Sequence, residues 1–142
     1  MAFFNKKGAG VHTIYFVESL LNSLRCPAEL KWIPSDPDLN SLSSIYTRIK
    51  SHHNEKVQSS IMVPPKQLTL NKYGFIEEKE EEEELKLGET DVMICINMIH
   101  ISPWEATLGL MVEASKQLKP KTGYLYCYGP YLENGCGALS NM

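Results

Sequence analysis

The sequence predicts an α/β protein with a mainly parallel β-sheet, and three observations support this prediction. Segments with helical periodicity alternate along the chain with short segments typical of strands, as in consecutive βαβ units. The stretch Asp91–Ile96 is apolar without alternation after its first residue, which is typical of a strand buried on both faces. Apolar residues make up 43% of the 142 residues, enough for a real core. We therefore expect a single domain over residues 1–142.

The chain begins with a predicted strand, a glycine turn and a helix. Residues 1–4 form a short apolar stretch that fits the stump of a strand. Gly8–Gly10 follows, where the backbone can take conformations that other residues avoid. Apolar residues then recur every three or four positions over His12–Leu24, which is helical periodicity. Pro27 ends this helix, because a proline disfavours the helical conformation in the residue before it.

A second strand and a second helix are predicted next. The strand covers Glu29–Ile33, and the run Pro34–Asp38 is expected to break it. The helix covers Leu39–Ser51 and has its apolar side chains on one face. Either Asp38 or Ser35 is a suitable N-terminal cap for it, since both side chains accept hydrogen bonds from free backbone N–H groups.

The middle of the chain carries weaker signals and a strongly acidic run. A strand candidate lies within Val57–Val63, and brief apolar patches follow at 67–70 and 73–76. Glu77–Glu84 holds seven Glu and one Lys, and so carries a charge of -6. Like charges repel at every spacing, so residues 77–89 are expected to form a solvated linker or insertion.

The last third predicts a strand, a helix and a strand. After the buried strand at Asp91–Ile96, a helix is expected over Pro103–Leu118, with Pro103 as its first residue. Ser102 would cap this helix and Glu105 would complete a capping box. The next strand is predicted over Tyr124–Tyr128.

Composition argues against several classes of protein. The net charge of -3 becomes +3 without the acidic run, and neither value favours nucleic-acid binding. No apolar run reaches the ~18 residues of a membrane span, and Met1–Lys7 lacks the long apolar region typical of a secretory signal. The four cysteines show no CxxC spacing and predict no disulfide framework, so a cytoplasmic location is expected, with the nucleus as the alternative. His52 and His53 lack the ligand spacing of structural zinc, and no metal site is predicted.

Several segments together are typical of one family, and they are Gly8–His12, Trp32–Asp38, Asp91–Trp104, Leu118–Pro120, Tyr128–Tyr131 and Asn134–Gly135. In these segments the chain resembles the methyltransferase-like protein 26 family, whose members have a class I methyltransferase fold. The resemblance is strongest over Asp91–Gly135 and moderate over Gly8–Asp38. It implies a Rossmann-like three-layer sandwich that binds S-adenosylmethionine and transfers its methyl group to an unknown small molecule or protein. From its composition the chain is expected to have no nucleic-acid or membrane partner, and its oligomeric state is left open.

The resemblance also implies roles for individual residues. Gly8 and Gly10 would let the backbone approach the cofactor's methionine moiety, and Asp36, with Asp38 as the alternative, would accept hydrogen bonds from its ribose. Asn97 would face the cofactor, while His100 and Tyr128 would lie near the methyl acceptor, with His100 as a general base. Structural alternatives stand beside these roles. The glycines also fit a plain tight turn, His100 fits a packed residue that donates to a backbone carbonyl, and Tyr128 fits the edge of the core.

The chain departs from the family pattern in three places. Met1–Lys7 has no carboxylate before the glycines, Thr69 stands where members tend to have Asp, and the chain stops soon after the Tyr128–Tyr131 segment. We therefore expect a domain that is incomplete at both ends. An inactive or truncated relative that acts as a binding protein is the second hypothesis. A nucleotide-dependent oxidoreductase is a distant third, because Thr13 replaces the third glycine of the dinucleotide fingerprint.

Overall fold

The computed structural model describes residues 2–5, 11–23, 29–76, 88–133 and 136–137. Gly8 and Gly10 therefore lie outside the described residues, as do Pro27 and the whole acidic run Glu77–Glu84. The described elements alternate between strands and helices along most of the chain, so the α/β class is confirmed.

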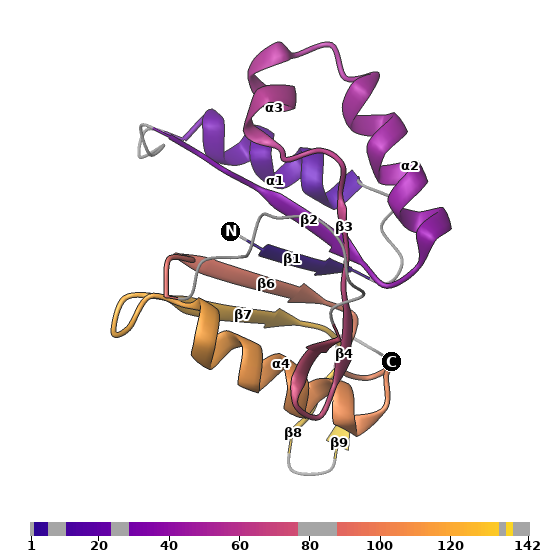
Figure 1. Cartoon of the computed structure of the whole chain (residues 1–142), viewed down its shortest axis with the longest axis vertical. Coiled ribbons are helices and arrows are strands. Elements are labelled where there is room, and N and C mark those ends of the chain that lie inside the picture. Colours follow the sequence, from indigo (N-terminus) through magenta and orange to yellow (C-terminus); the bar gives the residue numbers. More distant parts are fainter. Residues whose placement is uncertain (1, 6–10, 24–28, 77–87, 134–135, 138–142) are drawn as a thin grey trace.

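A five-stranded sheet forms the centre of the structure (Figure 1). Its order is β3-β2-β1-β6-β7, and every pair of neighbours is parallel. The strands are β1 (Ala2–Asn5), β2 (Ile33–Asp36), β3 (Lys66–Gln67), β6 (Val92–Ile96) and β7 (Tyr124–Tyr128). The chain extends the sheet from β1 to β2 and β3, and then returns to place β6 on the other side of β1. The strand order therefore reverses at β1.

Helices lie on both faces of this sheet (Figure 1). The elements on one face are α1 (Val11–Leu21), α2 (Leu39–Lys50) and α3 (Glu55–Ser60), and α4 (Trp104–Gln117) lies on the other. An antiparallel hairpin of β4 (Thr69–Asn71) and β5 (Gly74–Ile76) packs against α4. A second antiparallel pair joins β8 (Leu132–Glu133) to β9 (Cys136–Gly137). No helix in these described stretches has both the length and the apolar character needed to cross a bilayer.

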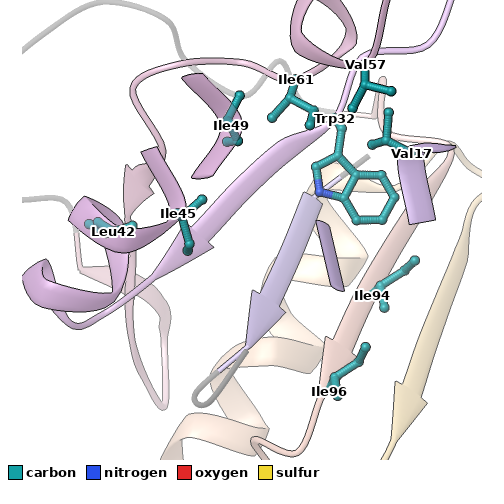
Figure 2. Close-up of a cluster of buried hydrophobic side chains, with 9 residues drawn as sticks. All are labelled: Val17, Trp32, Leu42, Ile45, Ile49, Val57, Ile61, Ile94 and Ile96. Carbon is teal, nitrogen blue, oxygen red and sulfur yellow. The ribbon is translucent and has the colours of Figure 1, made fainter. Parts of the chain in front are cut away.

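Two separate hydrophobic clusters fill the two faces, and β6 contributes to both. Ile94 and Ile96 belong to the first cluster, where the fully buried Trp32 lies among residues of α1, α2 and α3 (Figure 2). Met93 and Cys95 belong to the second cluster, which they form with α4 residues such as Leu110. This alternation follows from the period of two along a strand, and it confirms the prediction that β6 is buried on both faces.

The predicted boundaries of the second strand are wrong. The sequence predicts a strand at Glu29–Ile33 that ends before Pro34, whereas β2 continues through Pro34 to Asp36. Trp32 and Asp36 form backbone hydrogen bonds toward the β3 side. Because backbone directions alternate with a period of two along a strand, Pro34 points the same way between them. The neighbouring segment at 62–65 lies between the bridge at Trp32 and strand β3, so the missing N–H of proline costs no ladder bond there.

The strand predicted within Val57–Val63 is also wrong, because most of this segment is helix α3. Asn54 caps it: its Oδ1 accepts hydrogen bonds from the N–H groups of Lys56 and Val57 at 3.0 and 3.4 Å. Val57 is buried as a helical residue, and Ile61 forms an isolated bridge to Trp32 just beyond the helix. A six-residue helix is too short to show helical periodicity, so the apolar content of the segment resembles that of a strand.

The caps predicted for the helices α2 and α4 had different outcomes. Asp38 caps α2 as predicted, since its Oδ2 accepts from both the backbone N–H and the hydroxyl of Ser41 at 2.9 Å. The capping box predicted for Ser102 and Glu105 is wrong. Pro103 has an extended ψ of 149° and is itself the N-cap of α4, without a side-chain capping bond. The helix therefore begins at Trp104, and Ser102 lies one residue too early to cap it.

Candidate functional site

Polar residues gather at the carboxyl edge of the parallel sheet. Asp36 is the last residue of β2, Asn97 follows β6, and Gly129 follows β7. All these strands are parallel, so their carboxyl ends lie on the same edge of the sheet. The edge spans the point at β1 where the strand order reverses, which is where open α/β sheets bind ligands.

Asn97, His100 and Gly129 form a compact cluster on this edge. Asn97 has a left-handed backbone with φ of 53°, and its N–H donates to the Tyr128 carbonyl at 2.8 Å. A Cβ atom built on Gly129 would lie 3.2 Å from His100 Nδ1 and 3.7 Å from Asn97 Oδ1. The absence of a side chain at Gly129 therefore lets both polar groups approach the turn. The structure brings together two predicted site residues, and Tyr128 immediately precedes the turn.

The side chains of His100 and Tyr128 are both exposed. Tyr128 pairs with Ile96 in register, so it points to the same face of the sheet as Ile96. On β7 this face also carries Tyr124 and Tyr126, which are exposed as well. Tyr128 is thus part of a row of tyrosines along β7 rather than a residue of the core edge.

Asp36 lies at the end of β2 and is only 2% exposed. Its Oδ1 accepts a hydrogen bond from the Asp38 N–H at 2.9 Å, which fixes the turn before α2. Asp38 is the capping residue, and hydrogen bonds from the Ser41 backbone and side chain hold its pKa below the ordinary value of 3.8. The two carboxylates thus have separate positions, with Asp36 inside the sheet edge and Asp38 at the helix end.

The structure shows which residue ends the strand beside Asp36. Thr69 lies in β4, where it pairs with Ile76 in the hairpin, and so it is not part of the five-stranded sheet. The residue at the end of β3 is instead Gln67, opposite Asp36 in register. Its Nε2 donates to the Pro37 carbonyl at 3.2 Å. Sequence reasoning missed Gln67, and its signal is a polar residue at the end of a short strand.

A pair of cysteines also lies near the edge and was not predicted as a site. Cys95 and Cys127 are directly opposite in the β6–β7 register. A hydrogen bond from Cys95 lowers the pKa of Cys127 to about 7, against the raising effect of burial. The same hydrogen bond and burial raise the pKa of Cys95. Nearby, burial and then the charge of these cysteines raise the pKa of Tyr131. The apolar pattern of the two strands does not specify their register, so the sequence does not predict that these two cysteines are paired.

The fold and this site define an α/β protein with a polar cluster at the carboxyl edge of a parallel sheet. The chain belongs to the family described as protein of unknown function (DUF938), whose family model matches residues 6–142. No solved structure matches the chain.

Proposed function

We propose that this protein is an S-adenosylmethionine-dependent methyltransferase with a Rossmann-like fold and a methyl acceptor of unknown identity. The observation that carries the proposal is the placement of Asp36 and Asn97 on opposite sides of β1, at the carboxyl edge where the strand order reverses. Nucleoside cofactors bind at such a reversal in open α/β sheets. The resemblance to the methyltransferase-like protein 26 family gives independent support from the sequence.

In this proposal Asp36 binds the ribose hydroxyls of the cofactor. A carboxylate at the end of the second strand suits a diol because it accepts two hydrogen bonds. The hydrogen bond from the Asp38 N–H orients the Asp36 carboxylate before any ligand arrives. Gly8 and Gly10 follow β1 in the sequence and supply the close backbone approach that the methionine moiety requires. Asn97 holds the cofactor from the β6 side.

The acceptor side of the proposed site consists of His100 and Tyr128. The cofactor, when bound, supplies an electrophilic methyl group, and the protein has to orient the acceptor against it. The exposed imidazole of His100 lies beside the Asn97 turn and takes the proton of a protonated nucleophile. The exposed ring of Tyr128 contributes apolar surface and a hydroxyl for contact with the acceptor.

A second candidate is an inactive relative that binds a partner protein. It is favoured by the row of exposed tyrosines along β7, since tyrosine is enriched in protein interfaces. It is also favoured by Thr69, which replaces a carboxylate found in the resembling family and lies in the hairpin. Binding of the cofactor separates the two candidates, because a partner-binding protein does not need it.

The test is a calorimetric titration of S-adenosylhomocysteine into the purified protein, with NAD as the control ligand. Asp36→Asn is expected to weaken binding by about 1–3 kcal/mol, because it removes a charge-assisted hydrogen bond. Asp38→Asn is the matched control: it makes the same change two residues away and keeps a capping side chain. Absence of binding by the folded protein, or equal weakening in both variants, contradicts the proposal. Tighter binding of NAD points to the oxidoreductase instead.

A further inference from the structure

Three potential metal ligands, none of them assigned to the proposed cofactor site, meet between α1 and the turn that joins α2 to α3. Glu18 lies on α1, and His52 and His53 lie in the turn between α2 and α3. One ligand atom from each residue lies within 4.8 Å of the other two. Packing of α1 against α2 and α3 brings the carboxylate to the histidines. The sequence prediction of no metal site considered only the two histidines and the cysteines, and so missed this carboxylate.

The geometry of the three side chains is convergent. His52 Nε2 lies 3.2 Å from Glu18 Oε1. The two imidazole rings stack with their centroids 4.6 Å apart and an angle of 28° between their planes. The side chain of His52 is 11% exposed and that of Glu18 is 36% exposed, so the cluster sits partly inside the protein. His53 is exposed and can adjust its position.

The cluster lines a surface pocket of about 390 Å³. The apolar part of the wall comes from α1 and includes Ile14 and Tyr15. Arg48 also lines this pocket, and its positive charge opposes a bound cation. An ion here therefore has to be held by direct bonds to nitrogen and oxygen rather than by the general electrostatic field. This favours a transition metal over Mg²⁺ or Ca²⁺, which prefer several oxygen ligands.

We propose that Glu18, His52 and His53 form a binding site for a divalent transition-metal ion of the zinc type. Two imidazoles and one carboxylate are a ligand set that Zn²⁺ accepts, with bonds of about 2.0–2.2 Å. Four-coordinate geometry at that bond length places ligand atoms about 3.4 Å apart. The carboxylate and His52 are already close to that separation, at 3.2 Å, so mainly the exposed His53 has to move inward. The fourth position opens toward the pocket and takes water.

Metal binding at His52 changes its hydrogen bonding in a defined way. His52 Nδ1 now accepts a hydrogen bond from the Asn54 N–H at 3.2 Å. In its neutral form His52 therefore carries its proton on Nε2, the atom that lies 3.2 Å from Glu18 Oε1. Coordination of the metal through Nε2 moves the proton to Nδ1. A protonated Nδ1 cannot accept the hydrogen bond from the Asn54 N–H. The amide of Asn54, which is the N-cap of α3, thus reports whether the metal binds through this histidine.

The experiment is a titration of the metal-free protein with Co²⁺, followed by visible absorption, and then competition with Zn²⁺. We expect one ion per chain, with the visible bands of four-coordinate cobalt and no thiolate charge-transfer band in the near ultraviolet. Zn²⁺ should displace the cobalt and raise the melting temperature. In nitrogen-15 spectra, the Asn54 amide should shift together with the signals of Glu18.

Two variants and one control decide the assignment. Glu18→Gln and His53→Asn should each weaken Co²⁺ binding at least about tenfold, while circular dichroism stays unchanged. His12→Asn removes a histidine from the same helix as Glu18, and it should bind Co²⁺ as the wild type does. His12 does not line the pocket. The proposal fails if no saturable binding occurs, if both variants bind like the control, or if a thiolate band places the ion at the cysteines.

Discussion

Replacing Gly109 by alanine is expected to destabilise the protein, although alanine is the better helix former. Gly109 lies in α4 against the β4–β5 hairpin, and a Cβ atom added there would lie 1.8 Å from the carbonyl oxygen of Asn71. An ordinary carbon–oxygen contact is about 3.3 Å, so helix and hairpin would have to separate by about 1.5 Å. The atom in the way belongs to the backbone, which cannot rotate aside.

The magnitude follows from two opposing contributions. Alanine instead of glycine within a helix stabilises by about 1 kcal/mol. Overpacking typically costs about 1–3 kcal/mol, and a clash with backbone places Gly109 at or above the upper end of this range. The free energy of unfolding should therefore fall by about 2 kcal/mol, mostly because Leu70 of the hairpin and Leu68 just before it lose contacts with the cluster at Leu110.

Urea denaturation at equilibrium measures this difference, with an unchanged slope as a check that the unfolded state is the same. Ser115→Ala is the control. It lies on the exposed side of α4 and gains helix propensity without a clash, so it should stabilise by a few tenths of a kcal/mol. If Gly109→Ala is as stable as Ser115→Ala, the close packing of α4 on the hairpin does not require glycine at position 109, and the prediction is wrong.

Two further predictions concern titratable groups. Asp38 has a lowered pKa in the folded protein, so its capping contribution is fully present above the ordinary pKa of 3.8 and is lost as the pH falls through the lowered value. Thermal melts across the acid range should lose stability less steeply in Asp38→Asn than in the wild type, and identical profiles would contradict this. Cys127 should react with iodoacetamide at a rate that is half-maximal near its pKa of about 7, whereas the buried Cys95 stays unmodified in the folded protein. Mass spectrometry of the modified peptides measures both rates, and equal modification would show that Cys95 is accessible.

Local sequence patterns predict the elements whose burial is regular. The unbroken apolar run of β6, the strand β7 and the periodic face of α2 all have their predicted positions. The errors occur where tertiary contacts override local preference. Pro34 is accommodated in β2 because its missing N–H faces the stretch between the Trp32 bridge and strand β3, and α3 is too short for periodicity to separate a helix from a strand.

The candidate site is predictable only in part for the same reason. Asp36 ends a strand, and Asn97 and His100 come after one, so the parallel order alone places them on one edge. The Cys95–Cys127 pair depends on the register of two strands, and the approach of Glu18 to His52 depends on helix packing. Such contacts between distant parts of the chain leave no periodic trace in the sequence.

The division of β6 between two hydrophobic clusters has a consequence for the cooperativity of unfolding. Met93 and Cys95 belong to one cluster while Ile94 and Ile96 belong to the other. A shift of this strand by one residue would put each side chain into the wrong cluster, so both clusters have to form with the same register. The amides of β6 should therefore be among the slowest to exchange with deuterium. A ligand that contacts Asn97, directly after this strand, would then slow exchange in both halves of the molecule.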